Sequence, residues 1–206
     1  VALNYSRNKL GATLGGGWNQ YKGDHYGYVI WSEFSSNSFI DKPWYTNTGD
    51  KTDFNVYAKA NYQFNKLLNF YIDLQVRNID YAMEGIHDDL RDLTQDHTFT
   101  FFNPKGGLFL TLDKGNSLFA SVAVAHREPN RSAFRDADPG QQVSAERLID
   151  FESGYKFLGK KISLEVNWYY MKYRDQLVLT GQINNVGDPI LVNVPNSYRT
   201  GIELSG

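Results

Sequence analysis

The sequence contains no cysteine, so a disulfide framework, a thiolate zinc site and a cysteine nucleophile are all excluded. Its 21 lysines and arginines nearly balance 23 aspartates and glutamates, giving a formal charge of −2. Neither a basic surface for nucleic acid nor an acidic disordered tail is therefore expected. No apolar run approaches the ~20 residues of a membrane-spanning helix. Any part of this chain that meets lipid must do so as strands.

The two ends of the chain predict a piece of a longer protein. The sequence of 206 residues begins at Val1 rather than at a methionine, and it stops directly after the strand-like run 201–205. We therefore expect residues 1–206 to form a single partial domain.

Apolar and polar residues alternate without a break over residues 52–64. One side carries Phe54, Val56, Ala58, Ala60, Tyr62 and Phe64, and the other carries Asn55, Tyr57, Lys59, Asn61 and Gln63. The alternation resumes at 68–76 after the short link Asn65-Lys66. A period of two predicts strands with one apolar and one polar face, and the short link predicts a hairpin.

The same pattern predicts about nine strands in all. The others lie near residues 1–5, 9–20, 98–112, 116–127, 147–158, 161–178 and 197–205. Beyond Arg77 the apolar positions slip by one residue, which predicts a bulge near Asn78. Helical periodicity is weak throughout, and only 85–96 has room for a short helical turn.

Strand and loop lengths favour a membrane barrel over a soluble sandwich or adhesin module, in which strands also alternate. Globular strands average about 5 to 6 residues, whereas several of these reach the roughly 9 to 11 that cross a bilayer. Short connections alternate with long ones near 21–51, 84–97, 128–146 and 179–196. Aromatic residues also gather near the strand ends. We predict an all-β fold, an antiparallel up-and-down transmembrane β-barrel.

Three stretches of the sequence resemble the barrel of TonB-dependent receptors, particularly those of Bacteroidetes. They are residues 124–137 (VAHREPNRSAFRDA), residues 146–155 (ERLIDFESGY), and residues 168–179 (WYYMKYRDQLVL) followed by 193–203 (NVPNSYRTGIE). The resemblance implies about nine strands of a larger barrel of about 22 strands that is closed by a plug. The plug and its energy-coupling segment would lie outside this chain.

The same resemblance implies a function and a location. Receptors of this family sit in the bacterial outer membrane, capture a ligand at the outer loops and plug, and take it up when the TonB complex pulls on the plug. An iron-siderophore complex or a similar scarce chelate is the expected cargo, and outer-membrane lipid is an expected partner. A passive porin or an adhesive barrel without energy coupling is the alternative.

Candidate ligand-binding residues fall in the predicted outer loops. A charged loop suits a metal chelate, with a solvated loop as the alternative reading; its candidates are His87, Asp88, Asp89 and Arg91. A basic loop suits an anionic ligand, with a salt-bridge network as the alternative; its candidates are Arg127, Arg131 and Arg135. An aromatic loop suits stacking on a flat or glycan-like ligand, with interfacial anchoring as the alternative; its candidates are His25, Tyr26 and Trp31.

Enzymatic chemistry is not expected. The sequence has no Ser-His-Asp order, no HExxH, no GxSxG and no phosphate loop. The four histidines are scattered, which argues against a dedicated metal site, and no cofactor is expected. An isolated piece of barrel has two exposed strand edges, so we expect it to associate with further copies of itself.

Overall fold

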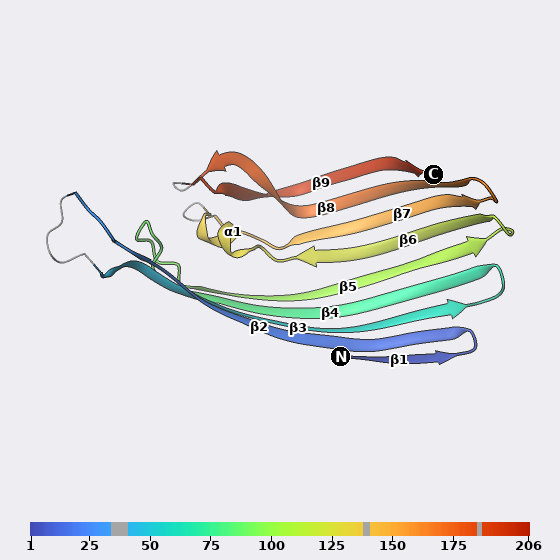
Figure 1. Ribbon diagram of the computed structural model, residues 1–206, viewed down its shortest axis with the longest axis horizontal. Helices are drawn as coiled ribbons and strands as arrows, with labels where there is room; N and C mark the ends of the chain where they lie inside the picture. The colour runs from blue at the N-terminus through green and yellow to red at the C-terminus, as the bar shows by residue number, and fades with distance from the viewer. Residues whose placement is uncertain (34–40, 138–140, 185–186) are drawn as a thin grey trace. The chain divides into compact units, whose positions relative to one another are not determined.

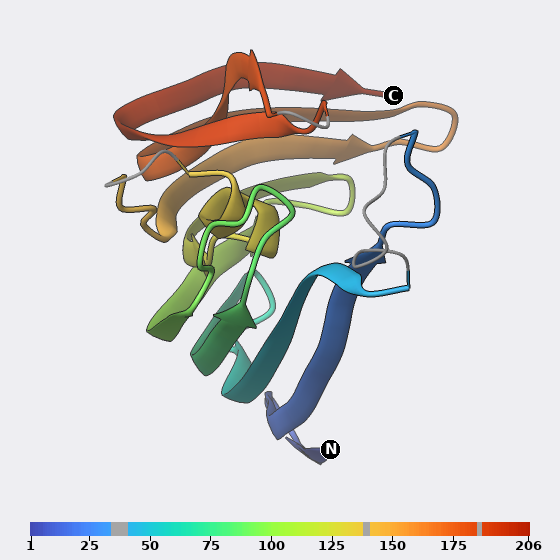
Figure 2. The same ribbon diagram turned by 90° about the vertical axis from the view of Figure 1, so that its left-hand side faces the viewer.

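Nine strands and one short helix make up the part of the chain that the computed structural model describes, residues 1–33, 41–137, 141–184 and 187–206. The elements are β1 (Ala2–Arg7), β2 (Leu10–Tyr28), β3 (Pro43–Gln63), β4 (Leu68–Gly85), β5 (Gln95–Thr111), β6 (Asn116–Arg127), α1 (Arg131–Arg135), β7 (Glu146–Leu158), β8 (Ser163–Ile183) and β9 (Pro189–Ser205). The strands form one sheet in chain order, β1 to β9 (Figures 1 and 2). An antiparallel up-and-down sheet confirms the predicted fold class.

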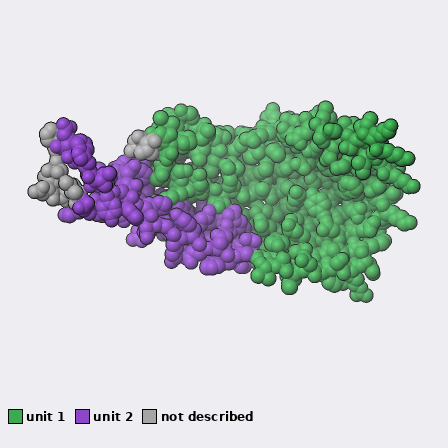
Figure 3. All heavy atoms as spheres, viewed as in Figure 1, with its two compact units in different colours: residues 1–16, 56–76, 101–206 green, residues 17–55, 77–100 purple. Residues whose placement is uncertain are grey.

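The chain divides into two compact units (Figure 3). The first unit comprises residues 1–16, 56–76 and 101–206, and the second comprises 17–55 and 77–100. The first unit therefore contains β1, β6 to β9 and α1, together with segments of β2 to β5. The second contains the remainder of β2 to β5 and the connection from β4 to β5. No helix among the described residues is long and apolar enough to span a membrane.

Strand register in the first unit separates an apolar face from a polar face. Cross-strand partners point to the same side of a sheet. One row of partners across β5 to β9 is Leu108, Ala120, Ser153, Trp168 and Ile202. The row displaced by three residues along each strand is Lys105, Ala123, Asp150, Met171 and Arg199. The alternation seen in the sequence therefore extends coherently across five strands.

Aromatic rings on the polar face lie over glycines of the neighbouring strand. A Cβ added to Gly107 would lie 2.6 Å from a ring carbon of Tyr71, and one added to Gly201 would lie 2.6 Å from the Tyr169 hydroxyl. Gly154 stands in the same relation to the ring of Phe119. Because only glycine leaves room for the ring, these positions couple adjacent strands by direct packing.

Several strands are longer than the sequence predicted. Strand β2 continues to Tyr28 and β3 begins at Pro43, so the connection expected at 21–51 shortens to 29–42. Likewise β9 begins at Pro189, and the connection expected at 179–196 shortens to 184–188. The residues added to β2 and β3 mix polar and aromatic side chains on both faces, and those added to β9 include Ile190, Leu191 and Val192 in succession, so neither stretch shows a clean apolar and polar alternation.

Helix and turn positions also differ from expectation. The segment 85–96 contains no helix and is instead closed by an isolated bridge between Ile86 and Asp92. The helix lies at Arg131–Arg135, where Asn130 caps it by accepting a hydrogen bond from the Ala133 N–H at 2.9 Å. The short connections at 8–9, 64–67, 112–115 and 159–162 agree with the predicted rhythm of short and long links.

The change of apolar side along β4 does not require the bulge predicted near Asn78. Exposure alternates in the same phase along the strand, with Phe70, Ile72, Asp80 and Glu84 exposed. On the other side, Ile79, Tyr81 and Met83 are buried. The apolar side chains therefore change faces because their surroundings change along the strand, while the strand itself continues.

Candidate functional site

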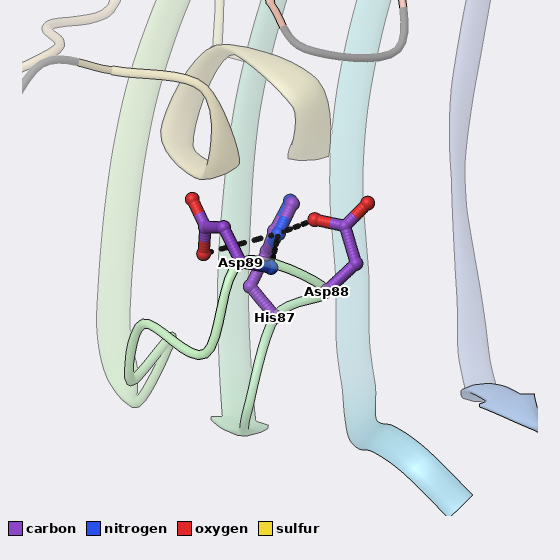
Figure 4. Close-up of side chains that lie close together, drawn as sticks. All are labelled: His87, Asp88 and Asp89. Atoms are coloured by element: carbon purple, nitrogen blue, oxygen red, sulfur yellow. Dashed lines mark hydrogen bonds and ion pairs between the residues drawn. The ribbon is translucent and has the colours of Figure 1, made fainter. Parts of the chain in front are cut away.

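The connection from β4 to β5 brings three of the predicted candidate residues into direct contact. Figure 4 shows the carboxyl groups of Asp88 and Asp89 on either side of the His87 ring. The Nδ1 atom of His87 is in contact with the Asp88 carboxylate and lies 3.3 Å from Oδ1 of Asp89. The imidazole is 6% exposed. The loop therefore holds a buried imidazole between two carboxylates.

Arg91 is bound to this cluster through Asp89. Its Nε donates to Asp89 Oδ2 at 2.6 Å, and its backbone N–H donates to Asp89 Oδ1 at 3.1 Å. Partial burial raises the pKa of the Asp89 carboxyl, but the hydrogen bonds and charge of Arg91 outweigh it and leave that pKa below its usual range. Asp89 is therefore ionised, and the Arg91 guanidinium binds its carboxylate.

The loop is tied to β3 by two side chains that the sequence analysis did not identify. The indole Nε1–H of Trp44 donates to the backbone carbonyl of Asp88 at 2.8 Å, and Asn47 Nδ2 donates to the carbonyl of Ile86 at 2.8 Å. Within the loop, the His87 N–H donates to the Arg91 carbonyl at 2.9 Å. These bonds fix the backbone on which His87, Asp88 and Asp89 stand.

One imidazole nitrogen and two carboxylate oxygens of His87, Asp88 and Asp89 lie within 4.8 Å of one another. Nitrogen and oxygen donors of these kinds are ligands for divalent transition ions. The same three side chains also contact one another directly, without any bound ion. The expectation that this chain has no dedicated metal site, made because its histidines are scattered, stays a prediction.

The aromatic candidates are placed differently from the loop that the sequence predicted. His25 and Tyr26 are successive residues of strand β2, so their side chains point to opposite faces. Tyr26 packs edge-on against Tyr28, with ring centroids 5.5 Å apart. Trp31 lies beyond the end of β2 and is largely exposed. The strand thus separates two residues that were expected to share one binding loop.

Two of the three candidate arginines are held in salt bridges in the first unit. Arg127 lies 3.1 Å from Glu146, which is buried and also accepts a hydrogen bond from the Leu177 N–H at 3.0 Å. Arg135 contacts Asp136 at 2.7 Å and Asp188 at 2.8 Å. Arg131 begins α1. These arginines therefore make salt bridges, and their role in binding an anion stays a prediction.

Replacing Glu146 with glutamine is expected to lower the free energy of unfolding by about 1–3 kcal/mol, because a buried charged acceptor is lost. The matched control is Glu165→Gln, whose partner Lys156 lies 3.0 Å away in an exposed pair. Exposed pairs contribute about 0–1 kcal/mol. Denaturant unfolding of the full-length protein compares the two, and equal effects would contradict the bracing role of Glu146.

Long up-and-down strands that expose one apolar face and alternate between short and long connections define the wall of a transmembrane β-barrel. The family model for TonB dependent receptor-like β-barrels matches residues 2–206. The chain belongs to that family.

Several solved structures share the fold of this chain. The chain aligns with the copper transporter OprC at a TM-score of 0.75 and 12% identity, covering 98% of this chain and 33% of that one. It aligns with the ferric-catecholate import receptor Fiu from E. coli K12 at a TM-score of 0.65 and 14% identity, covering 98% of this chain and 33% of that one. With the FrpB iron transporter from Neisseria meningitidis it aligns at a TM-score of 0.64 and 18% identity, covering 98% of this chain and 31% of that one. The chain thus spans about a third of these proteins.

The low identities make this a likeness of fold. No curated protein matches the sequence.

Proposed function

We propose that this chain is part of an outer-membrane receptor that imports a scarce nutrient, such as an iron-siderophore complex, with energy from the TonB complex. The observation that carries the proposal is the exposed apolar face of the first unit. Leu108, Phe151 and Ile202 are 49%, 44% and 68% exposed, and each belongs to a row of cross-strand partners on that face. A contiguous surface of this kind suits contact with lipid.

Aromatic pairs at both ends of the apolar face support the same orientation. Tyr62 and Phe70 stack at 6.3 Å beside the short link 64–67. Tyr170 and Tyr198 stack at 6.1 Å, and Tyr170 is the cross-strand partner of Phe151, which lies near the start of β7, the end that follows a long connection. Amphipathic rings favour the two interfaces between lipid and water. Short connections then face the periplasm and long connections face outward.

Ligand capture is the role proposed for the loop residues. The loop between β4 and β5 presents two carboxylates and an imidazole, which are groups able to bind a metal chelate. The remaining candidates, among them Tyr26, Trp31 and Arg131, are proposed as further contacts from the outer side. The coupling partner TonB would engage the plug of the whole receptor.

Uptake assays test the proposal. Deletion of the native gene is expected to abolish uptake of one substrate when iron chelates, cobalamin and glycans are supplied in turn, and the intact gene is expected to restore it. Loss of TonB function should abolish the same uptake. Uptake that continues without TonB would reject the energy-coupled receptor.

Conductance of the intact purified protein in planar bilayers separates a receptor from a passive porin. A plugged receptor is expected to stay closed, because the plug fills the barrel interior. Steady open channels would instead favour the porin.

A further inference from the structure

Three basic side chains line one groove on β7 and β8. The groove has a volume of about 370 Å³, and its lining includes Arg147, Lys172 and Arg174 together with Asn196 of β9. None of these residues was identified from the sequence as part of a site. We call the groove lined by these residues the basic groove.

Register places the basic groove on the apolar face of the sheet. Arg147 is the cross-strand partner of Arg174, and Lys172 is the partner of Ile149. Two residues further along β7, Phe151 is paired with Tyr170 on the same face. The three cations therefore continue the apolar face at its end, whereas Glu146 and Arg127 pair on the opposite side.

The charges of the basic groove are not balanced by its own lining. Directly opposite residues have Cβ atoms about 4.5–5.5 Å apart, and like charges in that relation destabilise a sheet. The only carboxylate in the lining is that of Asp175, 3.6 Å from Nε of Arg174. Three cations beside one carboxylate favour an external anion.

In the proposed orientation, the basic groove lies at the level of the lipid headgroups. The stacked pair Tyr170 and Tyr198 lies on the same face, and Tyr198 is the cross-strand partner of Lys172. In the proposed orientation this pair belongs to the outer aromatic girdle. The cations at and beyond that girdle then reach the headgroups of the outer leaflet.

A second groove on the same face is apolar. It has a volume of about 520 Å³, and its lining includes the small residues Ala120 and Ser153 between Leu118 and Trp168. Ser153 and Arg147 are six residues apart on β7, which is about 20 Å of strand at about 3.3 Å per residue. One leaflet of hydrocarbon is about half of the ~30 Å core. The two grooves are thus spaced like the headgroup and an acyl chain of one lipid.

We propose that the basic groove binds a phosphate group of lipopolysaccharide in the outer leaflet, while an acyl chain of the same molecule occupies the apolar groove. Guanidinium groups bind phosphate oxygens in pairs, and basic pockets beside a bilayer recognise anionic headgroups. This inference rests on the proposed location in the outer membrane.

The experiment measures lipid binding by the full-length receptor in detergent, using diphosphorylated lipid A as the probe. The double variant Arg147→Gln/Arg174→Gln is expected to bind lipid A at least tenfold more weakly. The matched control, Lys160→Gln/Lys161→Gln, removes two charges from the connection at the other end of the same hairpin and is expected to bind normally. Equal binding by both variants would overturn the proposal.

Further arms identify the source of the phosphate and do not depend on how the variants fold. The unmodified receptor is expected to bind lipid A more tightly than dephosphorylated lipid A, and to bind inorganic phosphate only weakly. Equal binding of the two lipids, or tight binding of inorganic phosphate, would overturn the assignment to lipid. Cell fractionation and chelate uptake are measured in parallel. If the receptor reaches the outer membrane and imports its substrate but does not bind lipid A, the lipid site is refuted and the proposed function stands.

Discussion

Replacing Val122 with arginine is expected to lower the stability of the membrane-inserted protein by about 2–4 kcal/mol, the cost of a cation on the lipid-facing side near the middle of the bilayer. Val122 lies midway along β6, is 41% exposed, and is the cross-strand partner of Phe151 on the apolar face. The effect follows from lipid contact, because the same exposed position in a water-soluble sheet would tolerate arginine.

The adjacent residue provides the matched control. Ser121 lies on the polar face opposite Glu152, so arginine there gains a carboxylate neighbour and is expected to change stability little. Reversible denaturant unfolding of the full-length protein from vesicles measures both variants. If Val122→Arg and Ser121→Arg have equal effects, the apolar face does not contact lipid and the proposed location fails.

Replacing Gly154 with valine is expected to destabilise the sheet by about 1–3 kcal/mol or more, the usual cost of forcing extra volume into a packed site. A Cβ at this position would collide with the ring of Phe119 and with the backbone carbonyl of Val166. The carbonyl belongs to the neighbouring strand of the ladder and cannot turn away as a side chain can. Movement of side chains alone therefore cannot remove the clash with this carbonyl.

Gly11 serves as the control for this substitution. It also lies in a strand, but a Cβ added there would meet nothing within 4 Å. Gly11→Val is expected to leave the unfolding midpoint nearly unchanged, and the double variant Gly154→Val/Phe119→Ala is expected to recover only part of the loss. Full recovery in the double variant would show that the carbonyl contact is unimportant.

Strand positions were predictable where the two faces of a strand meet different surroundings. Phe54, Val56 and Ala58 alternate with polar residues, and that stretch of β3 was predicted correctly. The earlier stretch of the same strand, around Thr46 to Asp50, is polar on both sides. Its pairing depends on backbone hydrogen bonds to neighbouring strands, which leave no periodic signal in the side chains.

The candidate site was predictable only where its members are close in the sequence. His87, Asp88 and Asp89 meet because a tight loop holds consecutive residues together, whereas the bond from Trp44 to the carbonyl of Asp88 joins residues 44 positions apart. The partners of Arg135 depended in the same way on the position of Asp188, in the next long connection. The basic groove required the register of β7 with β8 before its cations appeared on one face.

The backbone bonds of the loop between β4 and β5 bear on how fast a ligand can be captured. The Ile86 N–H donates to the Thr46 carbonyl at 2.9 Å, the Leu93 N–H donates to the Gly85 carbonyl at 2.8 Å, and Leu93 itself is buried. A loop held in this way loses little conformational entropy when a ligand arrives. For the proposed receptor, we therefore expect diffusion of the ligand, rather than rearrangement of this loop, to limit the rate of capture at low ligand concentration.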